Sequence, residues 1–385
     1  MEKNTLRLIF GCLILSLNFG TFAQTLETSW KFETSARVLA SPIEKDGMVY
    51  VGDAAGVFYA IEVSTGKAMW KIETNGNIQA KALIVNDNVF FESANIFYLV
   101  KGSNGKEVWK FDTGMEPLSF TYKEKTYDYK IDPFDDKRSA ATLSEGIIYI
   151  GSGNGTLYGL DAKTGKVSLS LKSDDDSPIR SSPLVSRGKL YFGDWNGVVY
   201  CYELKTEKLL WKKKTYRGEK PYGTFGGVVS EFVAHQDLLY FGARNYMLNV
   251  LLAETGEKEW TFTDPGRGWM IGDPVIYKDT LYVGGSDNFS MYAFHPAIGQ
   301  PFWSQNGEKN IYTKPILTEK WLLYTGGNGY NWRDAGRLFM LNRKTGKEID
   351  FFETPNGIFS SPLLVEKKVI FGCYDGNVYC VDIKP

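Results

Sequence analysis

The segment VYVGDAAGVFYAIEVSTGKAMW, residues 49–70, decides the fold because close variants of it return along the chain at a period of about 40 residues. Clear copies occupy residues 148–169 (IYIGSGNGTLYGLDAKTGKVSL), 190–211 and 281–303. A truncated copy, VIFGCYDGNVYCVDIKP, occupies residues 369–385. A fixed period of this size indicates stacked copies of one supersecondary unit, each burying its apolar faces against its neighbours.

Each copy of the repeat predicts four short strands joined by tight turns. The first strand follows a Ser-Pro pair such as Ser182-Pro183, where proline fits because the first residue of a strand need not donate to the ladder. The second strand is apolar and ends in glycine, and an Asn-Gly or Asp-Gly turn leads into an alternating third strand. A Thr-Gly-Lys turn, as at 65–67, precedes the fourth strand. Tryptophans hold one equivalent place on that strand: Trp30, Trp70, Trp109, Trp211, Trp260 and Trp303.

The turns mark seven complete copies and an eighth that lacks its fourth strand. Residues 28–33 supply the missing strand, with Trp30 at the tryptophan position. The sequence therefore predicts an all-β fold, an eight-bladed β-propeller of four-stranded antiparallel blades whose ring is closed by the N-terminal strand joining the last blade. We interpret the repeated tryptophans as structural wedges between neighbouring blades, since an indole buries a large apolar area. Two copies carry Leu169 and Asp350 instead.

The repeat resembles the PQQ-like propeller repeat over essentially all of residues 24–385. Two branches of that family are similar to this chain, the quinoprotein alcohol dehydrogenases and the BamB-type propellers, which are non-enzymatic subunits of the outer-membrane β-barrel assembly machinery. Length and blade number are closest to the BamB type. The resemblance implies a non-enzymatic scaffold that binds a protein in the cell envelope, such as a β-barrel assembly subunit or an unfolded outer-membrane protein.

The N-terminus indicates export. Residues 1–23 have a short basic start, an apolar run and small residues before Gln24, as a signal peptide does, which leaves 24–385 as a single propeller domain. Cys12 lies inside the apolar run, so we expect no lipid anchor, in departure from BamB-type proteins. We expect a monomeric propeller in the periplasm or at the periplasmic face of the outer membrane, with no membrane-spanning segment. Cys201, Cys373 and Cys380 fit buried thiols better than a disulfide framework.

Five insertions interrupt the regular spacing, at residues 112–137, 173–177, 213–225, 263–269 and 326–336. The first four link successive blades and the last joins a second strand to a third, so all five are expected on one face of the disc, which makes that face the candidate site. Apart from 173–177, they contain the aromatic and arginine residues that dominate interface energetics. The predicted partner-binding residues are Tyr216, Tyr222, Arg267, Trp269, Tyr330, Trp332 and Arg333, together with Trp195 in a short turn.

Other chemistries find weaker support. The net charge of −1 gives no electrostatic basis for nucleic-acid binding. A PQQ-dependent dehydrogenase stays open as an alternative, and it would need PQQ, calcium and a carboxylate base. The chain lacks the adjacent cysteines often found at that cofactor, so we assign no catalytic, cofactor-binding or metal-binding residue. His235 and His295 lie in different repeats, residues 151–155 fit a hairpin turn, and 174–176 fit a solvated acidic turn. A glycan-binding propeller stays open as an alternative, because aromatic faces bind both proteins and sugars.

Overall fold

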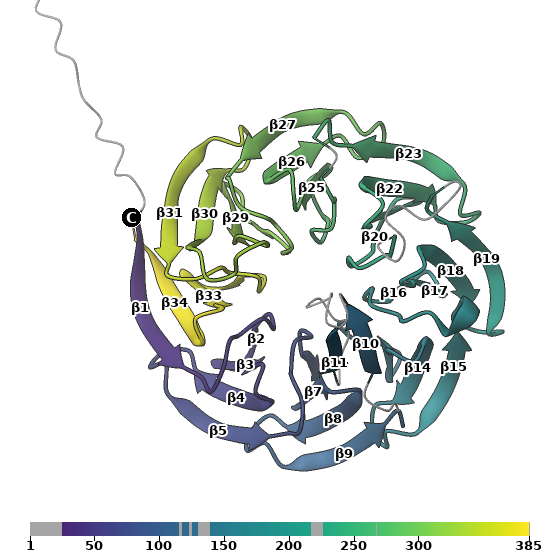
Figure 1. Cartoon of the computed structure of the whole chain (residues 1–385), viewed down its shortest axis with the longest axis horizontal. Coiled ribbons are helices and arrows are strands. Elements are labelled where there is room, and N and C mark those ends of the chain that lie inside the picture. The colour runs from purple at the N-terminus through teal and green to yellow at the C-terminus, as the bar shows by residue number, and fades with distance from the viewer. Residues whose placement is uncertain are drawn as a thin grey trace, which may run out of the picture.

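Eight four-stranded antiparallel sheets stand around a central axis like the blades of a propeller (Figure 1). The structure, a computed structural model, describes residues 25–114, 139–216, 226–266 and 268–384, and the backbone of 118–122 and 125–129. Sequential strands lie side by side in the first seven blades, from a short innermost strand to a longer outermost one, and the last blade has the order β32-β33-β34-β1 from the inside outward. The predicted fold class is therefore confirmed.

The strands of the first four blades have the following bounds: β2 (Ile43–Lys45), β3 (Met48–Gly52), β4 (Val57–Glu62) and β5 (Ala68–Glu73); β6 (Leu83–Val85), β7 (Asn88–Ser93), β8 (Ile96–Lys101) and β9 (Glu107–Asp112); β12 (Thr142–Ser144), β13 (Ile147–Gly151), β14 (Thr156–Asp161) and β15 (Val167–Lys172); β16 (Leu184–Ser186), β17 (Lys189–Gly193), β18 (Val198–Glu203) and β19 (Lys208–Lys214).

The remaining blades comprise β20 (Val233–His235), β21 (Leu238–Gly242), β22 (Met247–Leu252) and β23 (Lys258–Thr263); β24 (Val275–Tyr277), β25 (Thr280–Gly284), β26 (Ser290–Phe294) and β27 (Pro301–Asn306); β28 (Ile316–Leu317), β29 (Trp321–Gly326), β30 (Gly336–Asn342) and β31 (Glu348–Thr354); β32 (Leu363–Val365), β33 (Lys368–Gly372), β34 (Asn377–Lys384) and β1 (Thr25–Glu33).

The ring closes through β1, which is the outermost strand of the last blade and pairs antiparallel with β34. Trp30 lies opposite Cys380, after a bulge that follows Thr28. The Leu26 amide also donates to Asp350 Oδ2 of β31 in the neighbouring blade, at 2.9 Å. The two ends of the chain thus share one sheet, and β34 has no open edge, as the sequence predicted.

Burial explains why the middle strands read as apolar runs. In the first blade β3 and β4 are buried almost throughout, whereas β5 alternates between exposed and half-buried positions. A middle strand has a blade packed on each of its faces, so both sets of its side chains must be apolar. The apolar clusters accordingly join residues from adjacent blades, as where Phe58 of β4 stacks on Phe91 of β7.

The repeated tryptophans lie between blades, each against the glycine of the next blade's Thr-Gly-Lys-like turn. A Cβ placed on Gly66 would come within 2.7 Å of Trp30 Cδ2, and one on Gly105 within 2.8 Å of Trp70 Cε3. The same pairing recurs for Trp109 with Gly165, Trp211 with Gly256, Trp260 with Gly299, and Trp303 with Gly346. Five of these indoles also donate to a backbone carbonyl of that next blade.

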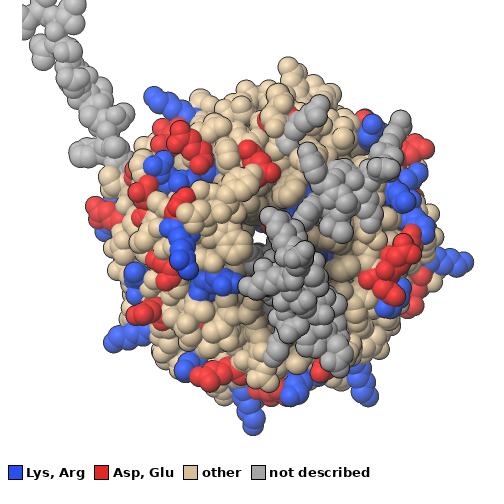
Figure 2. All heavy atoms as spheres, viewed as in Figure 1, with Lys and Arg blue, Asp and Glu red and all other residues tan. Residues whose placement is uncertain are grey.

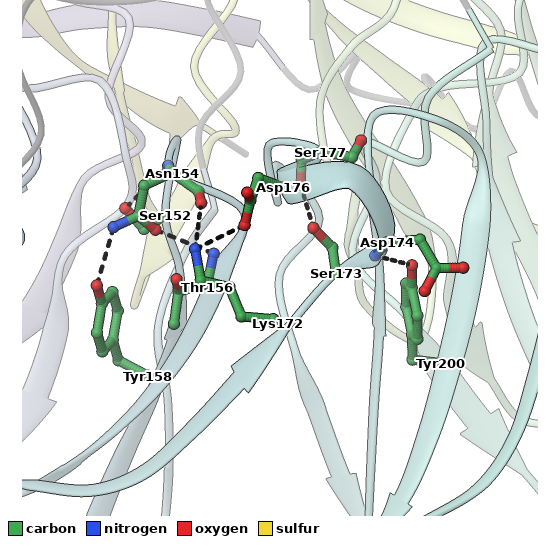
Figure 3. Close-up of polar contacts among 10 residues, drawn as sticks. All are labelled: Ser152, Asn154, Thr156, Tyr158, Lys172, Ser173, Asp174, Asp176, Ser177 and Tyr200. Carbon is green, nitrogen blue, oxygen red and sulfur yellow. Dashed lines mark hydrogen bonds and ion pairs between the residues drawn. The ribbon is translucent and has the colours of Figure 1, made fainter.

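Two links contain structure that the sequence did not predict. The backbone of the long link after β9 forms an additional hairpin of β10 (Leu118–Tyr122) and β11 (Lys125–Tyr129). The link after β15 contains a one-turn 3-10 helix, η1 (Asp174–Asp176). Asp176 pairs with Lys172 at 2.8 Å, and the Asp174 amide donates to the Tyr200 hydroxyl at 2.7 Å. Figure 3 shows how these side chains lie around the turn. Lys212 pairs with the Asp174 carboxylate at 2.7 Å, so lysines of the adjacent strands neutralise much of the charge of this acidic turn.

The three cysteines after the N-terminal segment are buried thiols. Cys201, Cys373 and Cys380 are free, and burial raises the pKa of their thiols to about 11, about 12 and about 11. They therefore pack as small apolar side chains, as the sequence predicted.

The surface of the disc carries both signs of charge. On the face drawn in Figure 2, basic and acidic side chains intermingle around the perimeter. Searching the described residues finds no helix with the length and apolarity that crossing a membrane requires.

Candidate functional site

One face of the disc carries both the links between blades and the turns from second to third strand. A backbone hydrogen bond joins the two in several blades: the Trp195 amide donates to Pro178 O at 2.8 Å, and the Arg244 amide to Gly227 O at 2.9 Å. Equivalent bonds run from Ala54, Ser286 and Tyr374 to Arg37, Trp269 and Gly357. We call this side the loop face. The described residues of all five insertions found in the sequence lie on the loop face.

A cavity of about 290 Å³ lies in the central channel on the loop face. Residues from all eight blades line it, most of them from the links that lead into the innermost strands. Turns of the fifth, sixth and seventh blades add Arg244, Asp287, Tyr330 and Trp332. A concave site of this size with a few convergent polar groups is the usual form of a small-molecule or side-chain pocket.

Each innermost strand is preceded by one equivalent position of the repeat, and these eight positions form a ring around the cavity. We call them the floor ring: Ser41, Lys81, Ala140, Ser182, Glu231, Asp273, Lys314 and Ser361. Side chains of the ring accept backbone N–H groups from the preceding blade, as where the Ser361 amide donates to Ser41 Oγ at 2.9 Å. The Ala140, Glu231 and Lys314 amides donate in the same way to Ser182 Oγ, Asp273 Oδ1 and Ser361 Oγ. Serine and aspartate can therefore both accept this hydrogen bond between neighbouring blades.

The charged members of the floor ring differ in burial and pairing. Lys314 Nζ lies 2.5 Å from Glu231 Oε2, and the two side chains are 36% and 20% exposed. Burial lowers the pKa of Lys314, but the nearby Glu231 carboxylate outweighs this and leaves the pKa raised, so the ammonium stays charged. Lys81 stands across the ring, exposed to the cavity, and forms no ion pair with any acidic residue of the described ranges.

Arg244 is held between two indoles at the wall of the cavity. Its guanidinium carbon lies 4.9 Å from the ring centre of Trp195 and 4.8 Å from that of Trp269. Arg244 is only 8% exposed, and desolvation strengthens such cation–π contacts. Trp195 and Trp269 pack with Val229 and Ile271 in one cluster, so the sandwich is part of the wall's core.

Aromatic residues of the seventh and eighth blades continue the wall. Trp332 donates from Nε1 to Gly329 O at 2.8 Å, and its ring packs edge-on against Phe359 and Tyr374. Tyr312 packs on Phe359, and burial raises the pKa of its hydroxyl to about 12. Tyr330 differs, because its side chain is 77% exposed. Its hydroxyl donates a hydrogen bond to Asp287 Oδ1 at 3.1 Å.

The structure brings together only part of the predicted partner-binding set. Trp269, Tyr330 and Trp332 line one cavity, and the exposed Arg333 follows directly in the same turn. Trp195 is 9% exposed, and its ring packs against the Arg244 guanidinium. Tyr216 is half-buried against the Gly197 turn. Tyr222 and Arg267 lie outside the described residues.

Sequence reasoning missed Arg244, Tyr312, Phe359 and the charged floor ring. A signal for them exists in the repeat itself. Aligning the copies places Lys81, Glu231, Asp273 and Lys314 where other blades have Ser or Ala before the strand-initiating residue. In the structure, these four unusual residues all belong to the ring around the channel. The Ser-Pro pair of a single copy indicates only the start of a strand, so the ring becomes visible only when the copies are compared.

The acidic residues and cysteines that a calcium–quinone site would use were located in the structure. Within the described ranges, no three His, Cys, Asp or Glu side chains gather where they could hold a metal ion. Glu231 is paired with Lys314, and Asp273 accepts the Glu231 amide. The buried Cys201 and Cys373 belong to different blades.

Known proteins of three kinds share this fold. BamB from Moraxella catarrhalis superposes with a TM-score of 0.68 at 13% identity, covering 94% of this chain and 98% of that one. The computationally designed Ika8 protein gives 0.71 at 14%, covering 93% and 100%. A quinohemoprotein alcohol dehydrogenase from Comamonas testosteroni gives 0.70 at 14%, covering 93% and 76%. At these identities the likeness shows the fold alone.

Sequence relatives with curated descriptions match short segments. The human beta-alanine-activating enzyme is 28% identical over 109 residues, which are 28% of this chain and 10% of that protein. The mouse enzyme of the same name is 33% identical over 48 residues, 12% and 4% of the two chains. The matches thus span a tenth or less of those relatives' own length.

A protein-family model covers nearly the whole chain. The model described as outer membrane protein assembly factor BamB matches residues 23–116, 93–214 and 195–385 in overlapping segments. Those segments include all eight blades and every residue of the cavity wall. The chain therefore belongs to the family of outer membrane protein assembly factor BamB.

Proposed function

We propose that this protein is a non-enzymatic scaffold of the cell envelope that binds a protein partner through its loop face, in the assembly of outer-membrane proteins. Family membership supports the assembly role and a periplasmic location. The observation that carries the binding role is the turn between β29 and β30, which presents the exposed Tyr330 and Arg333 beside a preformed central cavity. Exposed Tyr and Arg around a rigid hollow are typical of interface hot spots.

The two faces differ in a way that favours this side for binding. The Thr-Gly-Lys-like turns of the opposite face are short and nearly identical in form, with a residue at positive φ in each, either glycine or, in the fourth blade, Glu207. The loop face carries the variable links, the additional hairpin β10–β11 and the cavity. Specific recognition needs a surface that differs from blade to blade, and the loop face provides it.

Partner capture by purified protein tests the proposal. Envelope proteins retained by the wild-type chain are identified by mass spectrometry, and affinity for a retained assembly subunit is then measured with the variant Tyr330→Ala/Arg333→Ala. We expect a loss of about tenfold or more, because both side chains are exposed and available to a partner. The matched control on the opposite face, Lys67→Ala/Lys347→Ala, should bind as the wild type does. Equal losses in both variants, or a loss in the control alone, would contradict the proposal.

The dehydrogenase alternative is not favoured, because the described acidic residues of the cavity are already paired or hydrogen-bonded. A direct check is dye-linked alcohol oxidation after incubation of the protein with PQQ and calcium. We expect no activity above background, and stoichiometric quinone binding with turnover would reverse this assignment.

A further inference from the structure

We propose that the central cavity is a binding site for an uncharged saccharide of one or two rings. The proposal is independent of partner binding on the surrounding face and concerns only the hollow at its centre. The cavity of about 290 Å³ has room for about ten water molecules, which is the space that a small sugar occupies. It is enclosed by residues from all eight blades, so a ligand inside it would be surrounded on its sides.

The wall of the cavity is strongly asymmetric. Aromatic rings are concentrated on the sixth, seventh and eighth blades, whereas the first four blades contribute aliphatic, serine, alanine, glutamine and lysine side chains. The aromatic residues of the wall are Trp269, Tyr312, Tyr330, Trp332 and Phe359. A pyranose ring has an apolar face of C–H groups, which packs well on flat aromatic surfaces, and an equatorial edge of hydroxyl groups. The cavity has one aromatic side and one polar side, and these match the apolar face and the hydroxyl edge of a pyranose.

The polar side offers donors and acceptors together. Ser41, Ser182 and Ser361 each accept a backbone N–H through Oγ, and no described acceptor takes the hydroxyl proton of any of them. These three protons are available to a ligand. The Lys81 ammonium adds donors, and the carboxylates of Glu231 and Asp273 add acceptors. A sugar hydroxyl both donates and accepts, so it can satisfy such a mixed lining, whereas an apolar ligand would leave it unpaired.

The charges of the lining favour an uncharged ligand. Three cations (Lys81, Arg244, Lys314) face three anions (Glu231, Asp273, Asp287), which gives a net charge of zero. Most are already engaged: Lys314 with Glu231, Asp273 with an amide, Asp287 with the Tyr330 hydroxyl, and Arg244 with two indoles. An organic cation would have to disrupt these contacts or bind without a counter-charge, which is costly in a partly desolvated site. An organic anion could pair with the Lys81 ammonium, but it would also lie near the carboxylates of Glu231, Asp273 and Asp287.

The repeat shows that these charges are not required by the fold. Ser41, Ser182 and Ser361 occupy the same ring position and maintain the blade-to-blade hydrogen bond. Placing Lys or Glu there costs desolvation and side-chain entropy that serine avoids. The charged floor is therefore a feature of the cavity and is best explained by something that binds in it.

The same comparison supplies variants that are expected to fold. Lys81→Ser, and Glu231→Ser/Lys314→Ser made together so that neither charge is left unpaired, install the residue that other blades use. Binding of glucose, galactose, mannose, N-acetylglucosamine and maltose to the full chain is measured by saturation-transfer NMR and calorimetry. We expect at least one of them to bind with a dissociation constant of about 10 mM or tighter, and each variant to weaken it about tenfold or more.

Controls distinguish binding in the cavity from sugar binding elsewhere on the disc and from loss of folding. Lys67→Ser on the opposite face should leave sugar binding unchanged, and melting temperatures should show that the variants are folded. Glucuronate and indole acetate serve as anionic probes of similar size and should bind more weakly than the best neutral sugar. The proposal is overturned if no sugar of the panel binds, if binding is insensitive to both floor variants, or if an anionic probe binds more tightly. Partner capture by the loop face is measured separately and does not depend on these outcomes.

Discussion

At the residue scale, the pairing of a tryptophan with the glycine of the next blade recurs at six places between blades. Gly105 adopts φ +71°, and Trp70 leaves no room for a Cβ there. The glycine is therefore required twice, once for its backbone conformation and once for the close approach of the indole. Sequence alone indicates the first requirement through the turn pattern. It cannot show the second, because the tryptophan belongs to a different repeat.

Gly105→Ala separates these two requirements when it is compared with Gly47→Ala. Gly47 has φ +78° but no neighbour within 4 Å of a Cβ. We expect Gly47→Ala to lower the free energy of unfolding by about 1–2 kcal/mol through backbone strain alone. Gly105→Ala should lose about 1–3 kcal/mol more, since the indole must shift. Urea unfolding of both variants measures this difference. Equal losses would show that the indole of Trp70 does not pack tightly on this turn.

A buried carboxyl in the fourth blade gives a pH-dependent prediction. Asp194 is fully buried, accepts the Val198 amide at 2.9 Å and the Tyr200 hydroxyl at 2.9 Å, and has its pKa raised to about 6 by burial. Between pH 4 and pH 6 the folded protein therefore holds this proton more tightly than the unfolded chain does. This group's contribution to stability is present at low pH and is lost as pH rises through about 6.

Asp194→Asn should remove that pH dependence. Relative to wild type, the variant should gain up to about 2–3 kcal/mol in unfolding free energy between pH 4 and pH 7. Denaturant unfolding of both proteins across this range gives the difference directly. A control of opposite sign is Asp161→Asn, because the hydrogen bond from Thr164 lowers the pKa of that exposed carboxyl. A difference for Asp194→Asn that stays constant with pH would show that the buried carboxyl does not titrate in this window.

At the element scale, the blade was predictable because its four strands alternate with turn residues that fix their ends. The bounds of β3, β4 and β5 agree with the apolar run, the alternating run and the strand after the Thr-Gly-Lys turn. The hairpin β10–β11 and the helix η1 were not predicted, because they belong to insertions that no other repeat shares. Without a second copy to compare, a long aromatic and charged link indicates an insertion but not its structure.

The closing strand β1 allows a direct test at this scale. Deletion of residues 25–33 removes Trp30 and opens the edge of β34, which pairs with β1 over its whole length. We expect the melting temperature to fall by about 10 °C or more, far beyond the effect of an ordinary terminal truncation. A synthetic peptide of the sequence TLETSWKFE, added in excess, should restore part of the loss by binding the open edge. A melting temperature within a degree or two of the intact protein would contradict closure by β1.

At the scale of the whole molecule, the disc separates stability from recognition. Regular strands, buried tryptophans and uniform turns hold the ring together, and the variable links gather on one face around the central cavity. The sequence predicted this separation from the positions of the insertions. It did not predict the cavity, because Lys81, Asp273 and Lys314 lie far apart in the chain and meet only when the ring closes. The burial of Trp195 could not be predicted for a related reason, since the Arg244 that packs on it comes from the next blade.

Site-specific photo-crosslinking in the native envelope tests the central claim most directly. A photoreactive phenylalanine derivative is placed at Tyr330 or Arg333 on the loop face, and at Lys67 or Lys347 on the opposite face, in full-length chains produced at equal levels. We predict covalent adducts with one partner protein, a subunit of outer-membrane protein assembly, from positions 330 and 333, and none from positions 67 and 347. Adducts formed only at 67 and 347, or none at 330 and 333 although the chains are folded, would contradict binding through the loop face.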